Sequence, residues 1–272
     1  MLSIRRQFNA EIKYIAQENG FKKITVPRMG ETYCRVTEEI LQVFELRNYS
    51  FQTCDVDISV LPIRGEINEH SFICAVEPIM LTELAGINFA GFTYERQNEE
   101  SIISCAQRTV EMFNKLAIPF LNGATTNYRA LSKLFNVSYQ RFGLYSFLNM
   151  NKLYMALNTK NTAVALNCCY SWIEHYKDYL RGKYVSMDSK EMVKEKIKMF
   201  EKYVEKLKLV DYDFFDPLLD TLEKNSREII SKKIETVWKV WFEEKIWQRT
   251  VPCPRFRIEK VFDLNWNSIS GG

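Results

Sequence analysis

Two aspartates in the segment 55–61 are the first candidates for chemistry. Asp55 and Asp57 alternate with aliphatic residues, which predicts a strand with its carboxylates on one face. Two carboxyl groups in a cleft can have different pKa values, so that one acts as a general acid and the other as a general base. Together with Glu45, they would instead supply ligands to a metal-dependent enzyme acting on nucleic acid. The alternation favours a simpler interpretation, in which both aspartates lie on the solvent face of a half-buried strand.

Cysteine and histidine spacing does not predict a metal site. The residues concerned are Cys34, Cys54, Cys74, Cys105, Cys168, Cys169, Cys253, His70 and His175. No Cys-x-x-Cys pair occurs, and the two histidines are too far apart in the chain to form a ligand motif. We expect the cysteines on predicted strands to be small buried hydrophobic residues. Cys168 and Cys169, with His175 one to two helical turns later, could form a reactive thiolate, although His175 also suits helix capping.

Motifs for nucleophilic catalysis and phosphate binding are absent from the sequence. It contains no Gly-x-Ser-x-Gly elbow, no His-Glu-x-x-His, and no Gly-rich phosphate loop. We therefore predict no catalytic residue, metal or cofactor.

Lysines recur every four residues in the segment 189–209. They are Lys190, Lys194, Lys198, Lys202 and Lys206. Nucleic acid could be contacted through the first four, but glutamates interleave with them at helical pairing distances. A surface that binds the phosphate backbone of a nucleic acid would have fewer acidic residues to offset its positive charge. The pattern therefore favours a solvated helix face.

The C-terminal segment 246–272 is rich in tryptophan and arginine, the residues most enriched at protein–protein hot spots. Our candidate partner-binding residues are Trp247, Arg249, Arg255, Phe256, Arg257 and Trp266. The alternative is a tail packed over the core with its aromatic side chains buried. A strand at 255–262 could pair with a sheet edge of this chain or of another one.

The elements that must position these residues change character along the chain. Apolar spacing predicts a helix at 4–19, a hairpin at 24–36, strands at 39–49, 55–61, 71–76 and 87–94, and a helix from the cap Asn98 to about 117, with Pro119 beyond its end. Further helices are predicted at 126–136, 144–158, 160–181, 189–209 and 217–245. Strands followed by helices indicate an α+β fold with an antiparallel sheet of about five strands.

Two domains are predicted, an α+β sheet domain at 1–123 and a helical domain with an aromatic tail at 124–272, and the two would be able to pack as one unit. Residues 1–123 carry a net charge of −4 and residues 124–272 a net charge of +7, which together give the +3 of the whole chain. No apolar run approaches the length of a membrane span or a secretory signal. The odd cysteine count favours reduced thiols, so we expect a cytoplasmic protein.

The first ~120 residues resemble the bacterial domain-of-unknown-function family 4304. The resemblance rests on the order of a helix ending at 19–23, a hairpin, the run 40–46, a strand ending at 60–62 and a helix closing at 118–121. It implies a fold and no established chemistry. The long helical C-terminal half departs from the family pattern.

The function expected from these features is protein interaction without catalysis, as in a bacterial immunity or defence component that binds another protein. Two alternatives stay open. One is the metal-dependent enzyme acting on nucleic acid through Asp55, Asp57 and Glu45, and the other is a structural homodimer.

Overall fold

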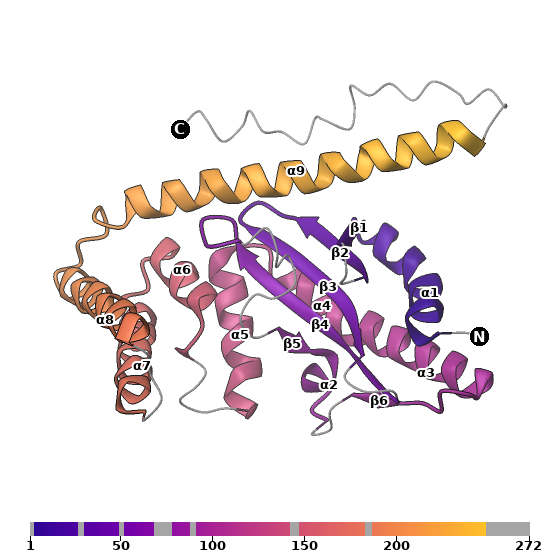
Figure 1. Ribbon diagram of the computed structural model, residues 1–272, viewed down its shortest axis with the longest axis horizontal. Helices are drawn as coiled ribbons and strands as arrows, with labels where there is room; N and C mark the ends of the chain where they lie inside the picture. Colours follow the sequence, from indigo (N-terminus) through magenta and orange to yellow (C-terminus); the bar gives the residue numbers. More distant parts are fainter. Residues whose placement is uncertain are drawn as a thin grey trace. The chain divides into compact units, whose positions relative to one another are not determined.

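The computed structural model describes residues 3–26, 30–48, 52–67, 78–87, 91–141, 147–182 and 187–248 (Figure 1). Within these ranges the chain forms an antiparallel sheet, an N-terminal helix and a largely helical remainder, which confirms the predicted α+β class. None of the described helices is both long and apolar enough to cross a lipid bilayer.

The first helix, α1 (Ile4–Glu18), forms because its apolar residues fall on one face. Its buried residues are Ile4, Phe8, Ile12 and Ala16. The Ser3 hydroxyl accepts a hydrogen bond from the Arg6 N–H and caps the helix. At the other end Gly20 takes a left-handed φ of 76°, which glycine adopts without steric cost. The predicted helix and its stop are confirmed.

The sheet is a meander extended by two short strands. Its strands are β1 (Lys22–Val26), β2 (Gly30–Val36), β3 (Ile40–Asn48), β4 (Thr53–Pro62), β5 (Ile79–Met80) and β6 (Phe92–Thr93). All pairs are antiparallel, in the order β1-β2-β3-β4-β5, and β6 also pairs with β4. The predicted hairpin and the strands at 39–49 and 55–61 are confirmed. Among the described residues of the stretch 87–94, Phe92–Thr93 is strand. The predicted strand 71–76 lies outside the described residues.

One face of the sheet packs onto helices that come before and after the main strands in the sequence. Phe44 of β3 stacks on Tyr33 and contacts Phe113, with ring centroids 4.9 and 4.4 Å apart respectively. Phe113 begins the π-helical turn (Phe113–Ala117) that joins α3 (Glu99–Met112) to α4 (Ile118–Gly123). Val56, Ile58 and Val60 of β4 belong to the same core as α1 and α3. This packing agrees with the predicted apolar strand face.

Pro119 does not end the helix that begins after Asn98, which corrects the sequence expectation. It lies in the first turn of α4, where the missing proline N–H would have no partner in any case. The preceding π turn allows the chain to continue from α3 into α4. The cap itself is as predicted, because the Asn98 side chain accepts from the Ser101 N–H.

The strand faces of β4 also need correction. The alternation predicted a half-buried strand, but Asp55 is 0% and Asp57 2% exposed, so both faces are buried. The strand tolerates these residues because protein groups engage both carboxylates, as described below.

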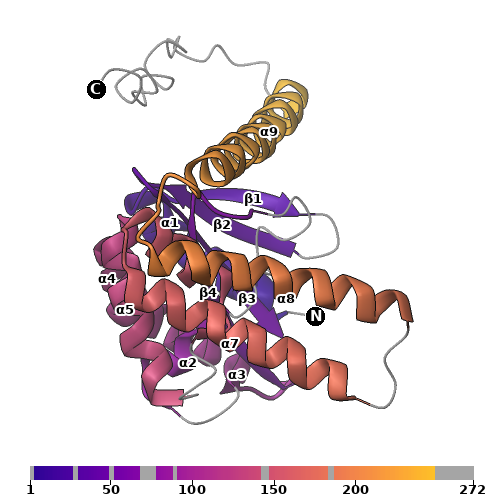
Figure 2. The ribbon, with the colours of Figure 1, turned by 90° about the vertical axis from the view of Figure 1, so that its left-hand side faces the viewer.

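Five helices complete the described chain, close to the predicted ranges. They are α5 (Asn127–Arg141), α6 (Met150–Asn158), α7 (Thr162–Arg181), α8 (Met187–Lys208) and α9 (Asp216–Gln248). α6 begins later than expected because the Asn149 side chain caps it, accepting from two backbone N–H groups. α7 and α8 lie side by side as an antiparallel hairpin (Figure 2).

Contacts divide the chain into two units, Met1–Ile234 and Glu235–Gly272. The predicted boundary after residue 123 falls inside the first unit. Gln42 of β3 donates hydrogen bonds to the carbonyl oxygens of Leu121 and Ala124, on both sides of that point. Residues 1–123 and 124–234 therefore pack around one core.

Candidate functional site

Glu45 and Asp57 are direct neighbours on the second face of the sheet. The register of β3 and β4 places them opposite each other, which brings cross-strand side chains within about 5 Å. Burial is the main cause that raises the pKa of Glu45 to about 7, and the charge of Asp57 adds to it. The Nε of Arg47 lies 2.6 Å from the Oδ2 of Asp57. Glu45 therefore keeps its proton to a higher pH than an exposed glutamate does.

Asp55 is held by a separate set of donors. Its Oδ1 accepts from the Val56 N–H at 2.7 Å, and the Thr82 hydroxyl donates to its Oδ2. Burial raises the pKa of Asp55, while these hydrogen bonds oppose the shift. Thr82 belongs to the short helix α2 (Leu81–Leu84), so this carboxylate anchors α2 to β4.

The carboxylate arrangement does not provide the ligand set of the metal-dependent enzyme. In the part of the chain that the structure describes, no three His, Cys, Asp or Glu side chains gather in a way that could hold a metal ion. Asp55, Asp57 and Glu45 are 0, 2 and 6% exposed, so a dissolved substrate does not reach them in this conformation. Their role in this structure is to hold the sheet together.

Cys168 and Cys169 are not the reactive thiolate that the sequence allowed. Both are fully buried on α7, and burial raises the pKa of each thiol to about 12. The exposed ring of His175 lies edge-on to Trp172, with centroids 5.7 Å apart. Cys34 and Cys54 are buried on strands as predicted. Cys74 and Cys253 lie outside the described residues.

The lysines of α8 are less neutralised than the sequence suggested. Lys194, Lys198 and Lys202 are exposed. Among the described side chains of α8, the ion pair is that of Lys206 with Asp211, at 2.8 Å, and no pair with the interleaved glutamates is found. The ammonium groups of Lys202 and Lys206 lie 5.0 and 5.2 Å from the ring centroid of Phe214. Lysine here packs on aromatic rings.

The predicted C-terminal partner site is not described at the level of side chains. Trp247 lies on the described backbone of α9. The remaining candidates, Arg249, Arg255, Phe256, Arg257 and Trp266, lie outside the described residues.

A row of aromatic rings in the helical half was missed by the sequence analysis. It runs through Tyr212, Phe215, Tyr203, Phe200, Trp172 and Tyr176, with neighbouring centroids 5.2–6.4 Å apart. Phe200 of α8 is buried beneath Trp172, and the two rings are nearly parallel. The row joins α7 to α8 and continues into the turn before α9. These residues come from three segments, so no single helical period reveals them.

One end of the α7–α8 hairpin is only partly covered. α6 has 9 residues and α7 has 20, so α6 can flank at most the first half of α7. Beyond Ile173, α7 carries no buried residue. The distal half of the hairpin therefore leaves large side chains exposed.

We call the side chains at this end the α7–α8 surface: the half-buried Tyr176 and the exposed Tyr179, Met192, Lys196 and Met199. Met192 is 53% and Tyr179 47% exposed. Met192 and Met199 are two turns apart on α8, and Lys196 lies between them on the same stripe. The Lys196 ammonium lies 5.6 Å from the ring centroid of Tyr176, which shows that this stripe of α8 and Tyr176 of α7 share one side of the hairpin. The spacing of the two methionines was the available sequence signal.

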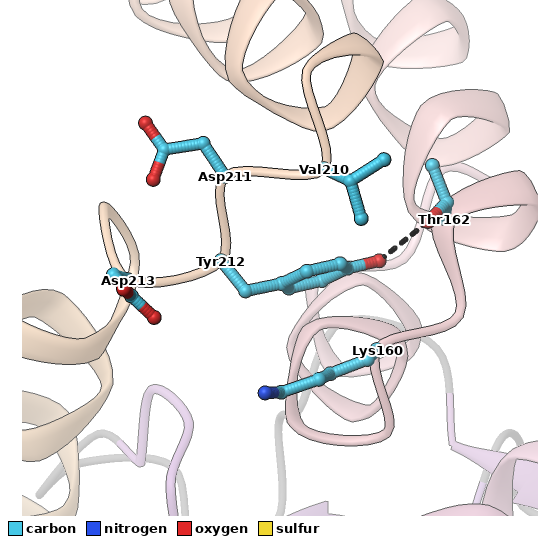
Figure 3. A pocket seen from close by; sticks show the side chains of 6 residues that line it. All are labelled: Lys160, Thr162, Val210, Asp211, Tyr212 and Asp213. Atoms are coloured by element: carbon cyan, nitrogen blue, oxygen red, sulfur yellow. Dashed lines mark hydrogen bonds between the residues drawn. The ribbon is translucent and has the colours of Figure 1, made fainter.

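A pocket of about 300 Å³ lies at the other end of the hairpin, where the α6–α7 and α8–α9 turns meet (Figure 3). It is lined by Lys160, Thr162, Val210, Asp211, Tyr212 and Asp213. The Tyr212 hydroxyl hydrogen-bonds to Thr162 at 2.7 Å and closes one wall. Lys160 and Val210 have left-handed φ values of 52° and 56°. Each follows a helix end, so both turns are αL caps built without glycine.

Comparison with known proteins adds no relative: no family model, no curated protein and no solved structure matches the chain. The resemblance of the first ~120 residues to family 4304 stays a prediction. What the structure defines is an α+β protein with a helical hairpin that exposes apolar side chains.

Proposed function

We propose that this chain is a non-catalytic protein-binding protein and that the α7–α8 surface is its interface. One observation carries the proposal. Of the nine large hydrophobic side chains that are exposed among the described residues, three lie on this surface: Tyr179, Met192 and Met199. Tyr170, Leu209 and Val210 are also exposed on α7, α8 and the turn that follows α8, outside the surface as defined. Concentrated apolar exposure of this kind is typical of interaction surfaces.

The chemistry of the surface indicates the chemistry of the partner. Tyrosine and methionine are enriched at interfaces because they offer large, adaptable contact area. Lys196 lies among them, and no ion pair to it is found among the described residues. An apolar patch with a carboxylate opposite Lys196 would complement this surface.

The test compares a variant with charge introduced on this surface and a control variant with charge introduced elsewhere. Met192→Asp with Met199→Asp places carboxylates on the surface, and Tyr128→Asp places one on an exposed residue of α5, 70% exposed, away from it. Proteins retained from an extract of the source organism by the wild type and by Tyr128→Asp should be lost from the double variant. The affinity of the purified partner should fall at least about tenfold.

Other outcomes point to other functions. Equal retention by both variants would remove the α7–α8 surface as the interface. Dimerisation of the pure wild type that the methionine changes abolish would support the structural homodimer. Loss of retention with Arg255→Ala and Arg257→Ala, but not with the methionine changes, would move the interface to the C-terminal candidates.

We also propose a cytoplasmic location. The described cysteines, Cys34, Cys54, Cys105, Cys168 and Cys169, are all free thiols, as in a reducing compartment. Fractionation of the host would test this. The proposed role in bacterial immunity or defence rests on analogy with other small α+β proteins that carry helical additions, and it would be tested by identifying the partner.

A further inference from the structure

Two cysteines far apart in the chain meet in the core of the sheet domain. Cys54, in the second position of β4, and Cys105, in the middle of α3, are separated by 51 residues, and their sulfur atoms lie 3.9 Å apart. They are 0 and 1% exposed. A disulfide needs the sulfurs at about 2.05 Å, so a small rotation of either side chain would bring them to bonding distance.

The surroundings make the two thiols unequal. The hydrogen bond between them lowers the pKa of Cys105 and raises that of Cys54. The Arg108 guanidinium and the Thr109 hydroxyl also lower the pKa of Cys105, while burial opposes them. Cys105 is therefore the thiol that more readily becomes a thiolate, and the thiolate is the nucleophilic form. Cys54 is the neighbouring thiol that would complete a disulfide with Cys105.

The two cysteines lie beside β6, one of the two shortest strands of the described sheet. Cys54 pairs with Phe92 of β6, a strand of only two residues. The exposed Arg108 reaches over the same strand to the Thr93 carbonyl oxygen, 3.5 Å away. So short a ladder opens at lower free energy than the central strands, and its opening would admit a small oxidant to the pair.

We propose that Cys54 and Cys105 form a reversible disulfide in response to a peroxide, which makes the β4–α3 junction an oxidation site of this protein. The Cys105 thiolate attacks hydrogen peroxide, so that a sulfur–oxygen bond forms and the O–O bond breaks; the hydroxide that leaves takes up the proton released by Cys105 and gives the first water. Cys54 then attacks the Cys105 sulfenic acid. The S–S bond forms, and the departing hydroxide takes the Cys54 proton to give water. Both sulfurs are oxidised and one peroxide is reduced to two waters.

The chain contains two further buried thiols for comparison, adjacent in sequence on α7. Cys168 and Cys169 are equally buried, but burial raises the pKa of both thiols to about 12 and neither has an arginine beside it. Peroxide should therefore leave this pair reduced under conditions that oxidise Cys54 and Cys105.

The experiment treats the full-length reduced protein with a small molar excess of hydrogen peroxide, alkylates the remaining thiols and maps disulfides by mass spectrometry without reduction. We expect the Cys54–Cys105 peptide to exceed every other linked pair at least about tenfold and to disappear on adding dithiothreitol. The oxidised protein should melt several degrees higher, because the bond closes a long loop. Recovery of both cysteines unlinked, or of either linked mainly to Cys74 or Cys253, would overturn the proposal.

Two variants separate the roles of the sulfurs. Cys54→Ala should trap Cys105 as a sulfenic acid that a dimedone probe labels, whereas Cys105→Ala should leave Cys54 unlabelled. The opposite labelling would contradict the assignment. The wild-type mapping decides the disulfide itself even where a variant folds poorly.

Discussion

Glu45 and Asp57 lie opposite each other across β3 and β4, and the Nε of Arg47 lies 2.6 Å from the Oδ2 of Asp57. The pKa of Glu45 rises to about 7 through burial and through repulsion by Asp57. A buried carboxyl therefore retains its proton over a pH range in which the unfolded chain has lost it.

The raised pKa of Glu45 predicts how the free energy of unfolding depends on pH. Because the pKa of Glu45 is raised on folding from 4.5 to about 7, its contribution is fully present below pH 4.5 and is lost as the pH rises through about 7. Glu45→Gln removes this titration. The unfolding free energy of the variant relative to the wild type should rise by roughly 1–3 kcal/mol between pH 5 and pH 8. Urea denaturation across that range measures it.

A control separates Glu45 from the other carboxylates. Asp55 also has a raised pKa, so the wild type and Glu45→Gln share its contribution, and it cancels in the difference. Glu18→Gln, the same substitution at an exposed position on α1, is the matched control for the loss of a carboxyl group. A constant offset for Glu45→Gln at every pH would show that Glu45 ionises normally.

Asp55→Ala should destabilise the protein by about 2–4 kcal/mol, because the Thr82 hydroxyl and the Val56 N–H lose a buried acceptor. If Asp55 faced solvent, as the sequence pattern predicted, the same substitution would leave the stability almost unchanged. A double-mutant cycle with Thr82→Val should show a coupling of roughly 1–2 kcal/mol. If the two changes are additive, the hydrogen bond contributes nothing and α2 is held by other contacts.

Gly91→Ala should destabilise the protein more than Gly86→Ala. Both glycines have positive φ, 97° and 67°, so alanine is strained at either position. A Cβ at Gly91 would also lie 2.4 Å from the Cys54 carbonyl oxygen, whereas one at Gly86 would meet nothing within 4 Å. We expect a loss of about 3 kcal/mol or more for Gly91→Ala and about 1 kcal/mol for Gly86→Ala, measured by thermal unfolding. Equal losses would contradict the close approach of β6 to β4.

Val210→Gly should stabilise the protein by about 0.5–1 kcal/mol. Val210 has a φ of 56°, a conformation that a β-branched residue adopts at a cost. Leu209 precedes it, is also exposed and has no positive φ. Leu209→Gly should therefore destabilise by about 1 kcal/mol. The same sign for both changes would argue against a left-handed turn at the end of α8.

The sequence determined the elements of this protein because their signals are local. Spacing of Ile4, Phe8 and Ile12 set the buried face of α1, and Asn98 marked the start of α3. The five later helices and the meander were also predictable, since apolar periodicity and caps act over only a few residues. Element ends were less certain where two signals compete, as at Pro119, which interrupts one helix pattern and also suits the start of another.

The candidate site was less accessible to sequence reasoning. Asp55 and Asp57 follow the pattern of a solvent face, and only the tertiary structure places Thr82 and Arg47 beside them. The aromatic row likewise depends on contacts between Trp172, Phe200 and Tyr203, which lie on two different helices.

The sequence by itself thus predicted the longer helices and strands and the apolar residues that face the core, but not the short elements α2 and β5. The tertiary structure decided that both faces of β4 are buried, that Cys54 meets Cys105 across 51 residues, and that α6 is too short to cover α7. The physical reason is that burial and ionisation of a side chain depend on groups distant in the chain. A local sequence pattern shows that a residue is polar. It does not show whether the folded chain places a hydrogen-bond or ion-pair partner beside that residue.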